Sequence, residues 1–491
     1  MLVAAPLAAQ VPEPADTAAP RAESSVPRRE ELAKRRVRGV ELAPGAIRCS
    51  GERITTLSFD RRPPGFTGRS AASRVANFPI RAVHRTTRPH VLNPYLLLEV
   101  GDVCSEPRRL ESERILRQLP FIQDAQVAAF PDGAGGVHLV VRTVDEFSFV
   151  ASPALSGTSL IGGRVGTTNL AGEGVRLEFG TRTNTVLRDE FTVRLRTAYL
   201  GRHPIQSALT WSRFGLGQTL ALEVRKPFLT DFQRVAWRAS LGTDEDCVRC
   251  QRPEDPIPFQ LARRAYGSLG GVRRFGSFGR TVLLGALFTQ DAEGIGESVL
   301  VDSIDGKQPF PAPLPTPAAP PRTVSRLALL AGARAVRFLP VEGFDALTGT
   351  QDLRLGVQWS AQLGRALPGV DRTLDSFYFA SDFYAGWGTS RWFAGTELFM
   401  SGRHGPEAWD GRVISGRSAL YLRDNSRALT LLEAQYVGAE RMRVPFQLTL
   451  GDGQAGLLGY RRAREGGEAR LNCVLYQRSC DVALGLPFNL W

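Results

Sequence analysis

Residues 352–364, DLRLGVQWSAQLG, decide the fold class because their apolar and polar side chains alternate with a period of two. One face of an extended strand would carry Leu353, Leu355, Val357 and Trp359. The other face would carry Arg354, Gln358 and Ser360. Such alternation predicts a β-strand with one apolar face and one polar face.

The same pattern recurs through residues 147–491, for example in VRLEFGTR (175–182), TLALEVRKPF (219–228) and RVAWRASLG (234–242). About fifteen such segments precede residue 451, and most are about ten residues long, the length at which a tilted strand crosses the hydrocarbon of a bilayer. This region therefore predicts a transmembrane antiparallel β-barrel of about 16 strands. A soluble β-sandwich, which also has one wet face and one apolar face, is the alternative.

Aromatic residues and connection lengths agree with a barrel. Tyr199, Phe228, Trp387 and Trp392 stand near strand ends and predict an interfacial girdle. Short turns are expected at 169–174, 199–204 and 226–231, and long polar loops at 242–258 and 290–323. The proline run in the second loop predicts unpaired chain outside the barrel, because proline lacks the N–H that a ladder needs. A proline-rich binding motif is the alternative there.

Residues 47–146 predict a separate α+β domain in the order strand, helix, helix, strand, strand. In residues 90–102, Val91, Tyr95 and Leu98 share one helix face, and Gly101 marks a stop. The second helix lies in residues 104–121, with Ser105 as a cap and Pro107 in the first turn. Two strands follow, at 123–130 and 136–147.

This order of elements resembles a POTRA domain of the BamA/TamA family, the bacterial surface antigen superfamily of outer-membrane proteins. The matching residues are Gly101, Asp102, Leu110, Glu113, Arg114, Leu116, Phe121 and the strand 137–141. The turn NLAGEG is similar to a family turn Asn-x-x-Gly-x-Gly, matched by Asn169, Gly172 and Gly174. The resemblance therefore predicts that a barrel follows a POTRA-like domain, with this turn on the periplasmic side.

The glycine-rich stretch GDGQAGLLGYRRAREGG (451–467) resembles the family loop that folds into the lumen around an Arg-Gly-Tyr or Arg-Gly-Phe motif. Its candidate lumen residues are Gly456, Leu457, Leu458, Gly459, Tyr460 and Arg461. Leu458 stands where the family has arginine. Residues 468–491 leave room for one or two strands, whereas several follow in the family, so the resemblance predicts a chain shortened at its C-terminus and an incompletely closed barrel.

The resemblance implies an outer-membrane protein, its N-terminal domain in the periplasm, that assists the assembly, insertion or translocation of other proteins. The implied partners are outer-membrane lipids, unfolded outer-membrane or secreted clients, and periplasmic proteins bound through the POTRA-like domain. The alternatives are a two-partner-secretion transporter and a plain porin or surface antigen.

Composition excludes several other classes. The net charge of +12 comes almost entirely from arginine, but the arginines are spread along the chain, so no nucleic-acid interface is predicted. No apolar run reaches the about 18 residues of a transmembrane helix. The five histidines show no metal-ligand spacing, and no nucleotide loop or nucleophile elbow occurs. We therefore expect neither an enzyme nor a cofactor.

The N-terminus and the cysteines complete the sequence-based predictions. Residues 1–10 resemble the remnant of a secretory signal peptide, with chance alanine richness as the alternative. Residues 11–46 have the composition of a disordered linker. Cys49 and Cys104 could pair in an oxidising compartment. Cys247 and Cys250 lie in a stretch that we expect to be a polar loop, where they form a disulfide or remain inert thiols.

Overall fold

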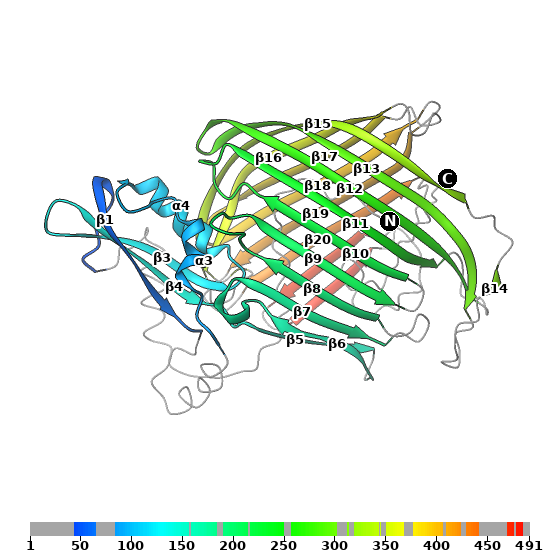
Figure 1. Cartoon of the computed structure of the whole chain (residues 1–491), viewed down its shortest axis with the longest axis horizontal. Coiled ribbons are helices and arrows are strands. Elements are labelled where there is room, and N and C mark those ends of the chain that lie inside the picture. Colours follow the sequence, from blue (N-terminus) through cyan, green and yellow to red (C-terminus); the bar gives the residue numbers. More distant parts are fainter. Residues whose placement is uncertain are drawn as a thin grey trace.

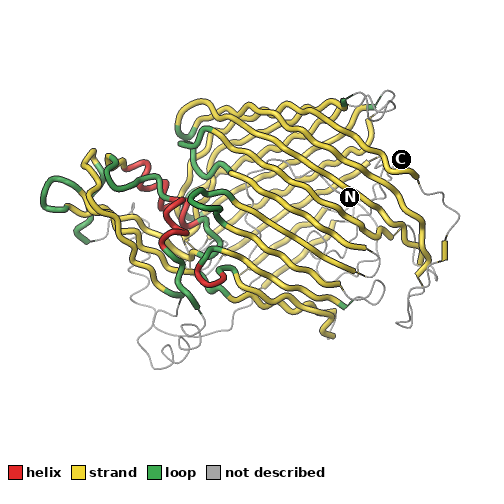
Figure 2. The backbone as a smooth tube through the Cα atoms, in the orientation of Figure 1, coloured by secondary structure: helices red, strands yellow, loops and turns green. Residues whose placement is uncertain are grey.

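The computed structural model shows two parts, an N-terminal α/β domain and a large β-barrel (Figures 1 and 2). It describes residues 44–64, 84–156, 159–183, 190–214, 217–249, 257–301, 312–313, 319–342, 344, 350–367, 377–405, 409–423, 429–440, 469–475 and 478–484. The expected mainly β architecture, with helices confined to the N-terminal part, is confirmed.

The N-terminal domain is a four-stranded sheet with helices on one face. Its strands are β1 (Ser50–Arg62), β2 (Val103–Ser105), β3 (Ile122–Pro131) and β4 (Val137–Asp145), arranged in the order β2-β1-β4-β3. β1 and β4 are parallel, and the other pairs are antiparallel. Helix α3 (Pro89–Leu92), the 3-10 turn η1 (Asn93–Tyr95) and helix α4 (Glu106–Arg117) lie between this sheet and the barrel (Figure 1).

The first expected helix is shorter than its apolar spacing suggested. Helical structure ends at Tyr95, and Leu96 is extended. Val91 and Tyr95 belong to one apolar cluster, whereas Leu98 belongs to a second cluster with Cys49 and Cys104. All three residues are buried, but they belong to two separate apolar clusters. A single continuous helix could not reach both clusters.

Helix α4 agrees with its prediction except at its cap. Pro107 lies in the first turn, and Ser105 is the N-cap residue but makes no side-chain cap bond. Ile115 and Leu116 are fully buried in the larger apolar cluster. Of the helices within the described ranges, none is both long and apolar enough to traverse a bilayer.

The barrel consists of the strand segments β5 to β22. Their bounds are β5 Phe149–Ser156, β6 Ser159–Thr167, β7 Val175–Arg182, β8 Glu190–Thr197, β9 Gln206–Phe214, β10 Gly217–Lys226, β11 Val235–Arg249, β12 Ile257–Ser277, β13 Arg280–Val301, β14 Ala312–Pro313, β15 Ala319–Glu342, β16 Thr350–Ala366, β17 Phe377–Gly388, β18 Trp392–His404, β19 Trp409–Arg423, β20 Leu429–Glu440, β21 Ala469–Leu475 and β22 Arg478–Leu484. A short 3-10 turn, η2 (Leu170–Gly172), joins β6 to β7.

The strands follow one another around a closed ring, with β13 paired to β15 as well as to the two-residue β14. Two strands, β21 and β22, follow the glycine-rich stretch, as its position predicted. In the strand order β22 lies next to β5, so the incomplete closure expected from the family resemblance is wrong for the described strands.

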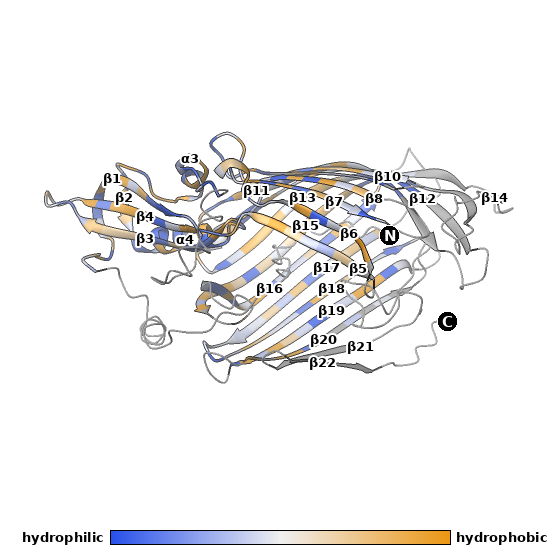
Figure 3. Cartoon of the chain, turned by 90° about the horizontal axis from the view of Figure 1, so that it is seen from below, coloured by the Kyte–Doolittle hydropathy of each residue, from blue (hydrophilic) through white to orange (hydrophobic). Residues whose placement is uncertain are grey.

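Rows of side chains across the barrel alternate between apolar and polar. Leu269, Phe288 and Leu327 are direct neighbours on β12, β13 and β15, and all three are exposed. The adjacent row contains Ser268, Thr289 and Arg326, of which the last two are buried. Figure 3 shows the same alternation of hydropathy along the strands. The apolar row faces outward and the polar row faces the lumen.

In residues 352–364, the apolar side chains do not all lie on the same face of the strand. Val357, Trp359 and Leu363 are exposed on the outer surface, as predicted. Leu353 and Leu355 are instead buried in a cluster with Phe344 and Tyr421. Gly356, between the two groups, has φ +119°, a conformation that breaks the regular alternation.

The expected long loops are partly strand. β11 continues to Arg249 and β12 begins at Ile257, so residues 242–249 of the expected loop pair with residues 259–266 of β12. The proline run is not wholly unpaired either, because β14 pairs with β13 and β15 begins at Ala319. The register skips Pro320 and Pro321, opposite a shift between Glu293 and Ile295, which places the prolines where no ladder N–H is needed.

Candidate functional site at the barrel mouth

The turn between β6 and β7 docks directly onto the N-terminal domain. Asn169 is buried, and its Nδ2 donates to Thr87 Oγ1 at 2.8 Å. Its Oδ1 accepts the N–H of Gly174 at 2.7 Å, which closes the turn. The Arg88 N–H donates to the Gly172 carbonyl at 3.0 Å. The three residues singled out in the sequence therefore form one joint; we call the barrel end beside the N-terminal domain the near mouth.

Both glycines of this turn are required by space and by backbone conformation. Gly172 and Gly174 have φ of +78° and +63°. A Cβ on Gly172 would lie 2.4 Å from the Thr86 carbonyl oxygen, and one on Gly174 would lie 2.8 Å from Val91 Cγ1. The turn is therefore matched to the surface it contacts.

Glu173 adds charge to the joint. Its carboxylate lies 2.7 Å from Arg88 and 2.8 Å from His90, and it accepts a hydrogen bond from Tyr199 Oη at 3.1 Å. The hydrogen bond from His90, followed by the one from Tyr199, lowers the pKa of Glu173. Tyr95 Oη also donates to the Ala198 carbonyl. The charged carboxylate thus holds the domain and two barrel turns together.

Of the four aromatic residues predicted to form a girdle, two lie on the outer surface of the barrel. Trp387 and Trp392 are exposed on the barrel surface. Tyr199 instead packs against the core of the N-terminal domain. Phe228 lies under the guanidinium of Arg274, whose Cζ is 3.8 Å from the ring centroid. Each residue lies two positions beyond the end of a strand, but the adjacent domain covers Tyr199 and a lumen arginine covers Phe228.

Two arginines of α4 reach the barrel at separate points. Arg117 makes hydrogen bonds to both oxygens of Asp352 on β16, the shorter at 2.9 Å, and both side chains are buried. Arg114 donates to the Leu229 carbonyl, and its Cζ lies 4.3 Å from the ring centroid of Phe338 on β15. The helix thus spans from the β10–β11 turn to the β15–β16 hairpin.

Carboxylates of the same helix hold these arginines in place. Glu111 pairs with Arg114 at 2.6 Å, and Glu113 pairs with Arg117 at 2.7 Å. Burial raises the pKa of Glu113, although two arginines oppose that shift. Each of these buried charges therefore has an oppositely charged partner, as buried ionic groups require.

The β10–β11 turn is tied to the inner wall through Asp231. This carboxylate lies 3.2 Å from Arg274 on β12 and 3.1 Å from Arg334 on β15. It also accepts the Gly279 N–H from the β12–β13 turn at 2.9 Å. One buried carboxylate thus joins three hairpins at the near mouth. It lies two residues after Leu229, whose carbonyl accepts the hydrogen bond from Arg114 of α4.

A Ser-His-Asp series lies where the N-terminal domain meets the first barrel strand. Ser148 Oγ is 2.9 Å from His84 Nδ1, and His84 Nε2 is 3.0 Å from Asp145 Oδ2. Asp145 also accepts the Thr87 N–H at 2.7 Å. Hydrolases use the same residue types. Here the series connects the segment before α3 to the end of β4 and the start of β5.

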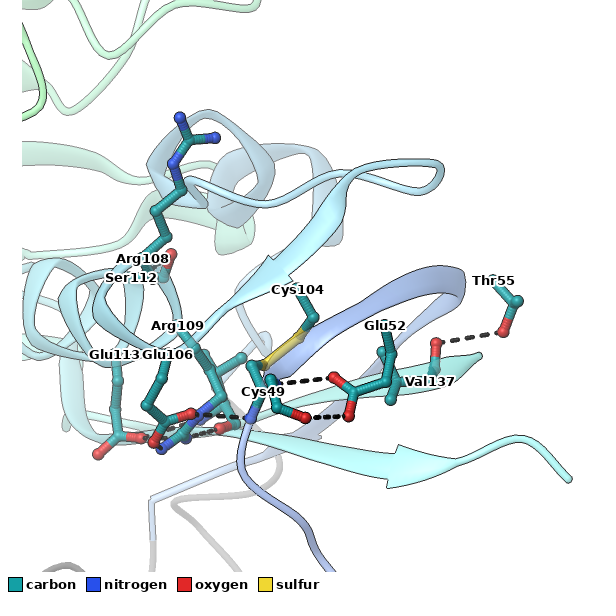
Figure 4. Close-up of a disulfide and its surroundings, with 12 residues drawn as sticks. Cys49, Glu52, Thr55, Cys104, Glu106, Arg108, Arg109, Ser112, Glu113 and Val137 are labelled. Atoms are coloured by element: carbon teal, nitrogen blue, oxygen red, sulfur yellow. Dashed lines mark hydrogen bonds and ion pairs between the residues drawn. A yellow bond between two sulfur atoms is a disulfide. The ribbon is translucent and has the colours of Figure 1, made fainter. Parts of the chain in front are cut away.

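The remaining predicted site residues lie apart from the near mouth or outside the described ranges. The structure joins Cys49 and Cys104 by a disulfide (Figure 4). Cys247 lies within β11, with its Cα opposite Leu261, so the predicted polar loop is wrong at this residue. Cys250 and the lumen-loop residues Gly456, Leu457, Leu458, Gly459, Tyr460 and Arg461 lie outside the described residues.

The sequence does not predict the contacts that Arg114 and Arg117 of α4 make with the barrel. Arg117 and Asp352 are separated by 235 positions, and neither belongs to a recognisable motif. Glu113 and Arg114 were singled out by the resemblance, but without this role. The sequence does show two arginines at i and i+3 on α4, but it does not show which part of the chain they contact.

Comparisons with known proteins are weak. No protein-family model matches the chain. A stretch of 22 residues is 91% identical to thymidylate synthase from Novosphingobium aromaticivorans, but it spans 4% of this chain and only 7% of that enzyme, so it carries no conclusion about activity.

Similar solved structures include those of a CdiB and a BamA. CdiB from Acinetobacter baumannii is 10% identical over 94% of this chain and 93% of that chain, with a TM-score of 0.41. BamA from Haemophilus ducreyi lacking POTRA domains 1–3 is 11% identical over 89% of this chain and 82% of that chain, with a TM-score of 0.37. At these sequence identities and TM-scores, the similarity supports no conclusion about activity.

Proposed function

We propose that this chain is an outer-membrane β-barrel protein that assists the insertion or translocation of other proteins, with its α/β domain on the periplasmic side. Support for the membrane comes from the outer surface, where Leu269, Leu327 and Leu329 are 62%, 53% and 69% exposed. Contiguous apolar surface of this extent is unfavourable in water. It matches the lipid-facing side of a membrane barrel.

The observation that carries the assembly role is the direction of the strands at the seam. Every resolved neighbour pair from β5 round to β22 is antiparallel, through β13–β15. These steps make β22 run in the same direction as β5. Among the described barrel strands, the seam is thus the one place where neighbours are parallel, and parallel pairing is slightly less stable per residue.

A strand entering at this seam would be antiparallel to both of its neighbours. It would also bring the ring to the even number of strands that is usual for bacterial barrels. We infer that the seam is the site where a client strand is accepted. The required chemistry is backbone hydrogen bonding, so the proposed role needs neither an enzyme mechanism nor a cofactor.

The near mouth argues against a plain diffusion pore. α4 spans this opening and is fixed to the barrel by the buried Arg117–Asp352 pair and by Arg114. A porin needs an open aqueous path, whereas here a domain is docked across the end of the lumen. A client protein that approaches from this side meets the α/β domain first.

The proposal is tested by depleting the protein in the bacterium that encodes it and measuring the folded fraction of other outer-membrane barrels by heat-modifiable gel mobility. We expect unfolded barrels to accumulate, and wild-type protein supplied in trans should restore folding. A variant with the conservative outward change Leu363→Val serves as a matched control and should also restore it. If outer-membrane barrels insert normally after depletion, the assembly role is wrong.

A second measurement separates assembly from a pore. Purified protein in planar bilayers should show only low, intermittent conductance, because α4 covers the near mouth. Steady, high conductance from wild-type protein would instead favour a porin.

A further inference from the structure

The inner wall of the barrel is hollowed over β5 to β8, beside the seam. The hollow has a volume of about 260 Å³ and is lined by residues of all four strands, among them Glu178. Glu178 is buried, whereas Val165, Phe179 and Phe191 of the same strands are exposed on the outer surface. The hollow therefore faces the lumen and not the lipid.

The hollow lies toward the end of the barrel opposite the near mouth, which we call the far mouth. β7 leaves the joint with the N-terminal domain at Val175 and ends at Arg182, and β8 begins at Glu190. The lining residues come from the later part of β7 and the first part of β8. A solute that enters through the far mouth would therefore not have to pass the N-terminal domain.

Three arginines surround a single glycine in this hollow. Gly180 on β7 is the register partner of Arg164 on β6 and of Thr192 on β8. Arg182 is the next lumen-facing residue along β7, and Arg194 is the next one along β8. Because Gly180 carries no side chain, the space between the three arginines stays open.

Positive charge exceeds negative charge in the hollow. Glu178 is already paired with Arg176 at 2.7 Å. Glu190 is the register partner of Arg182, but within the described residues no ion pair joins these two side chains, and none involves Arg194. Both arginines are half-buried. Partly desolvated guanidinium groups without a counter-charge favour the binding of an anion, because charge-assisted hydrogen bonds are stronger than neutral ones.

We propose that the hollow bounded by Arg164, Arg182 and Arg194 binds a phosphate group. A guanidinium group is a planar fork that bonds two phosphate oxygens at once, and one phosphate has enough oxygens for more than one fork. The volume is below the about 300 Å³ at which pockets for drug-sized ligands begin, so it suits the phosphate and a small part of the molecule that carries it. A soluble phosphate ester would arrive through the far mouth, and a lipid headgroup through the seam.

The test is a titration of the full-length protein in detergent with inorganic phosphate, followed by the phosphorus NMR line width at constant ionic strength. Arg182→Gln and Arg194→Gln should each weaken binding at least about tenfold, because each removes charge-assisted hydrogen bonds. Arg194→Lys should recover only part of the affinity, since lysine keeps the charge but loses the fork. The matched control Arg225→Gln removes a lumen arginine outside the hollow and should leave the affinity unchanged.

A second variant fills the hollow without removing charge. A Cβ on Gly180 would lie 3.8 Å from its nearest neighbouring atom, so Gly180→Val fits the strand and occupies the ligand space. It should also weaken phosphate binding at least about tenfold, by the loss of the same hydrogen bonds. Gly267→Val on β12 is the matched control, because a Cβ there would meet no atom within 4 Å and the site is outside the hollow. Heat-modifiable gel mobility verifies that each variant is folded.

The two sources of phosphate are separated by titrating glycerol phosphate and, in detergent micelles, phosphatidic acid. Binding of glycerol phosphate supports a soluble ester as the ligand, and binding of phosphatidic acid alone supports a lipid headgroup. The proposal is overturned if no phosphate compound binds, if acetate displaces phosphate as well as glycerol phosphate does, or if the folded hollow variants bind phosphate as the wild type does. None of these results bears on strand insertion at the seam, which the depletion experiment tests.

Discussion

Breaking the Arg117–Asp352 pair should release α4 from the near mouth. The two groups are 2.9 Å apart, and their side chains are only 8% and 6% exposed. At an effective dielectric constant of about 20, unit charges about 3 Å apart attract each other by about 5–6 kcal/mol. Desolvation offsets part of this attraction, and Glu113 remains as a second partner for Arg117. We expect a coupling energy of about 2–4 kcal/mol between the two side chains.

The assay is a double-mutant cycle of Arg117→Ala and Asp352→Ala, read by hydrogen–deuterium exchange of the α4 amides. Each single variant should speed exchange in α4 by about thirtyfold or more, since about 1.4 kcal/mol corresponds to a factor of ten. The double variant should be little worse than either single one. Amides of β12 and β13, far along the barrel, serve as the internal control.

The same variants should change conductance. Arg117→Ala and Asp352→Ala should each raise the open fraction in planar bilayers, whereas Arg117→Lys should have a smaller effect because it keeps the charge but loses the two-pronged geometry. If α4 exchange is unchanged in both single variants, or if the cycle gives a coupling below about 0.5 kcal/mol, the helix is not held by this pair and the reasoning is wrong.

Three further predictions concern the joint and the mouth. Gly174→Ala should weaken docking by about 2 kcal/mol or more, because φ is positive and Val91 occupies the space; faster proteolysis between domain and barrel would reveal it. Because the pKa of Glu173 is lowered, its stabilisation is present above the unfolded value of about 4.3 and is lost as the pH falls through the folded value; Glu173→Gln should remove this acid sensitivity of α3 exchange. Asp231→Asn should loosen three hairpins together, seen as faster exchange in the β10–β11 and β12–β13 turns.

The sequence predicts the local elements of this fold well because each depends on neighbouring residues. Strands such as β7 and β10 follow their period-two patterns, and α4 follows its cap position and proline. Leu98 was assigned to a helix because its spacing fits, and only the second apolar cluster shows why the chain must leave the helix. The reversal at Gly356 has a similar cause, since Phe344 and Tyr421 supply an inner cluster that no local pattern reveals.

The site was predicted only where one short stretch contains all of its parts. Asn169, Gly172 and Gly174 are close in sequence, and the turn they form is the joint. Asp231 acquires its role from arginines on two other hairpins, and Asp352 from a helix in another domain. These contacts join the ends of separate elements, and the sequence contains no spacing rule that links them.

Helix α4 connects the near mouth of the barrel to the β3 edge of the N-terminal sheet through shared residues. Glu113 accepts the Val127 N–H at the β3 edge and also pairs with Arg117, which reaches Asp352 in the barrel. Arg117 itself bonds to the Ala125 carbonyl on β3. Withdrawing α4 from the barrel removes a partner from Arg117 and leaves it with Glu113 and β3, so the edge cap is retained. Opening the mouth therefore does not require exposure of the β3 edge.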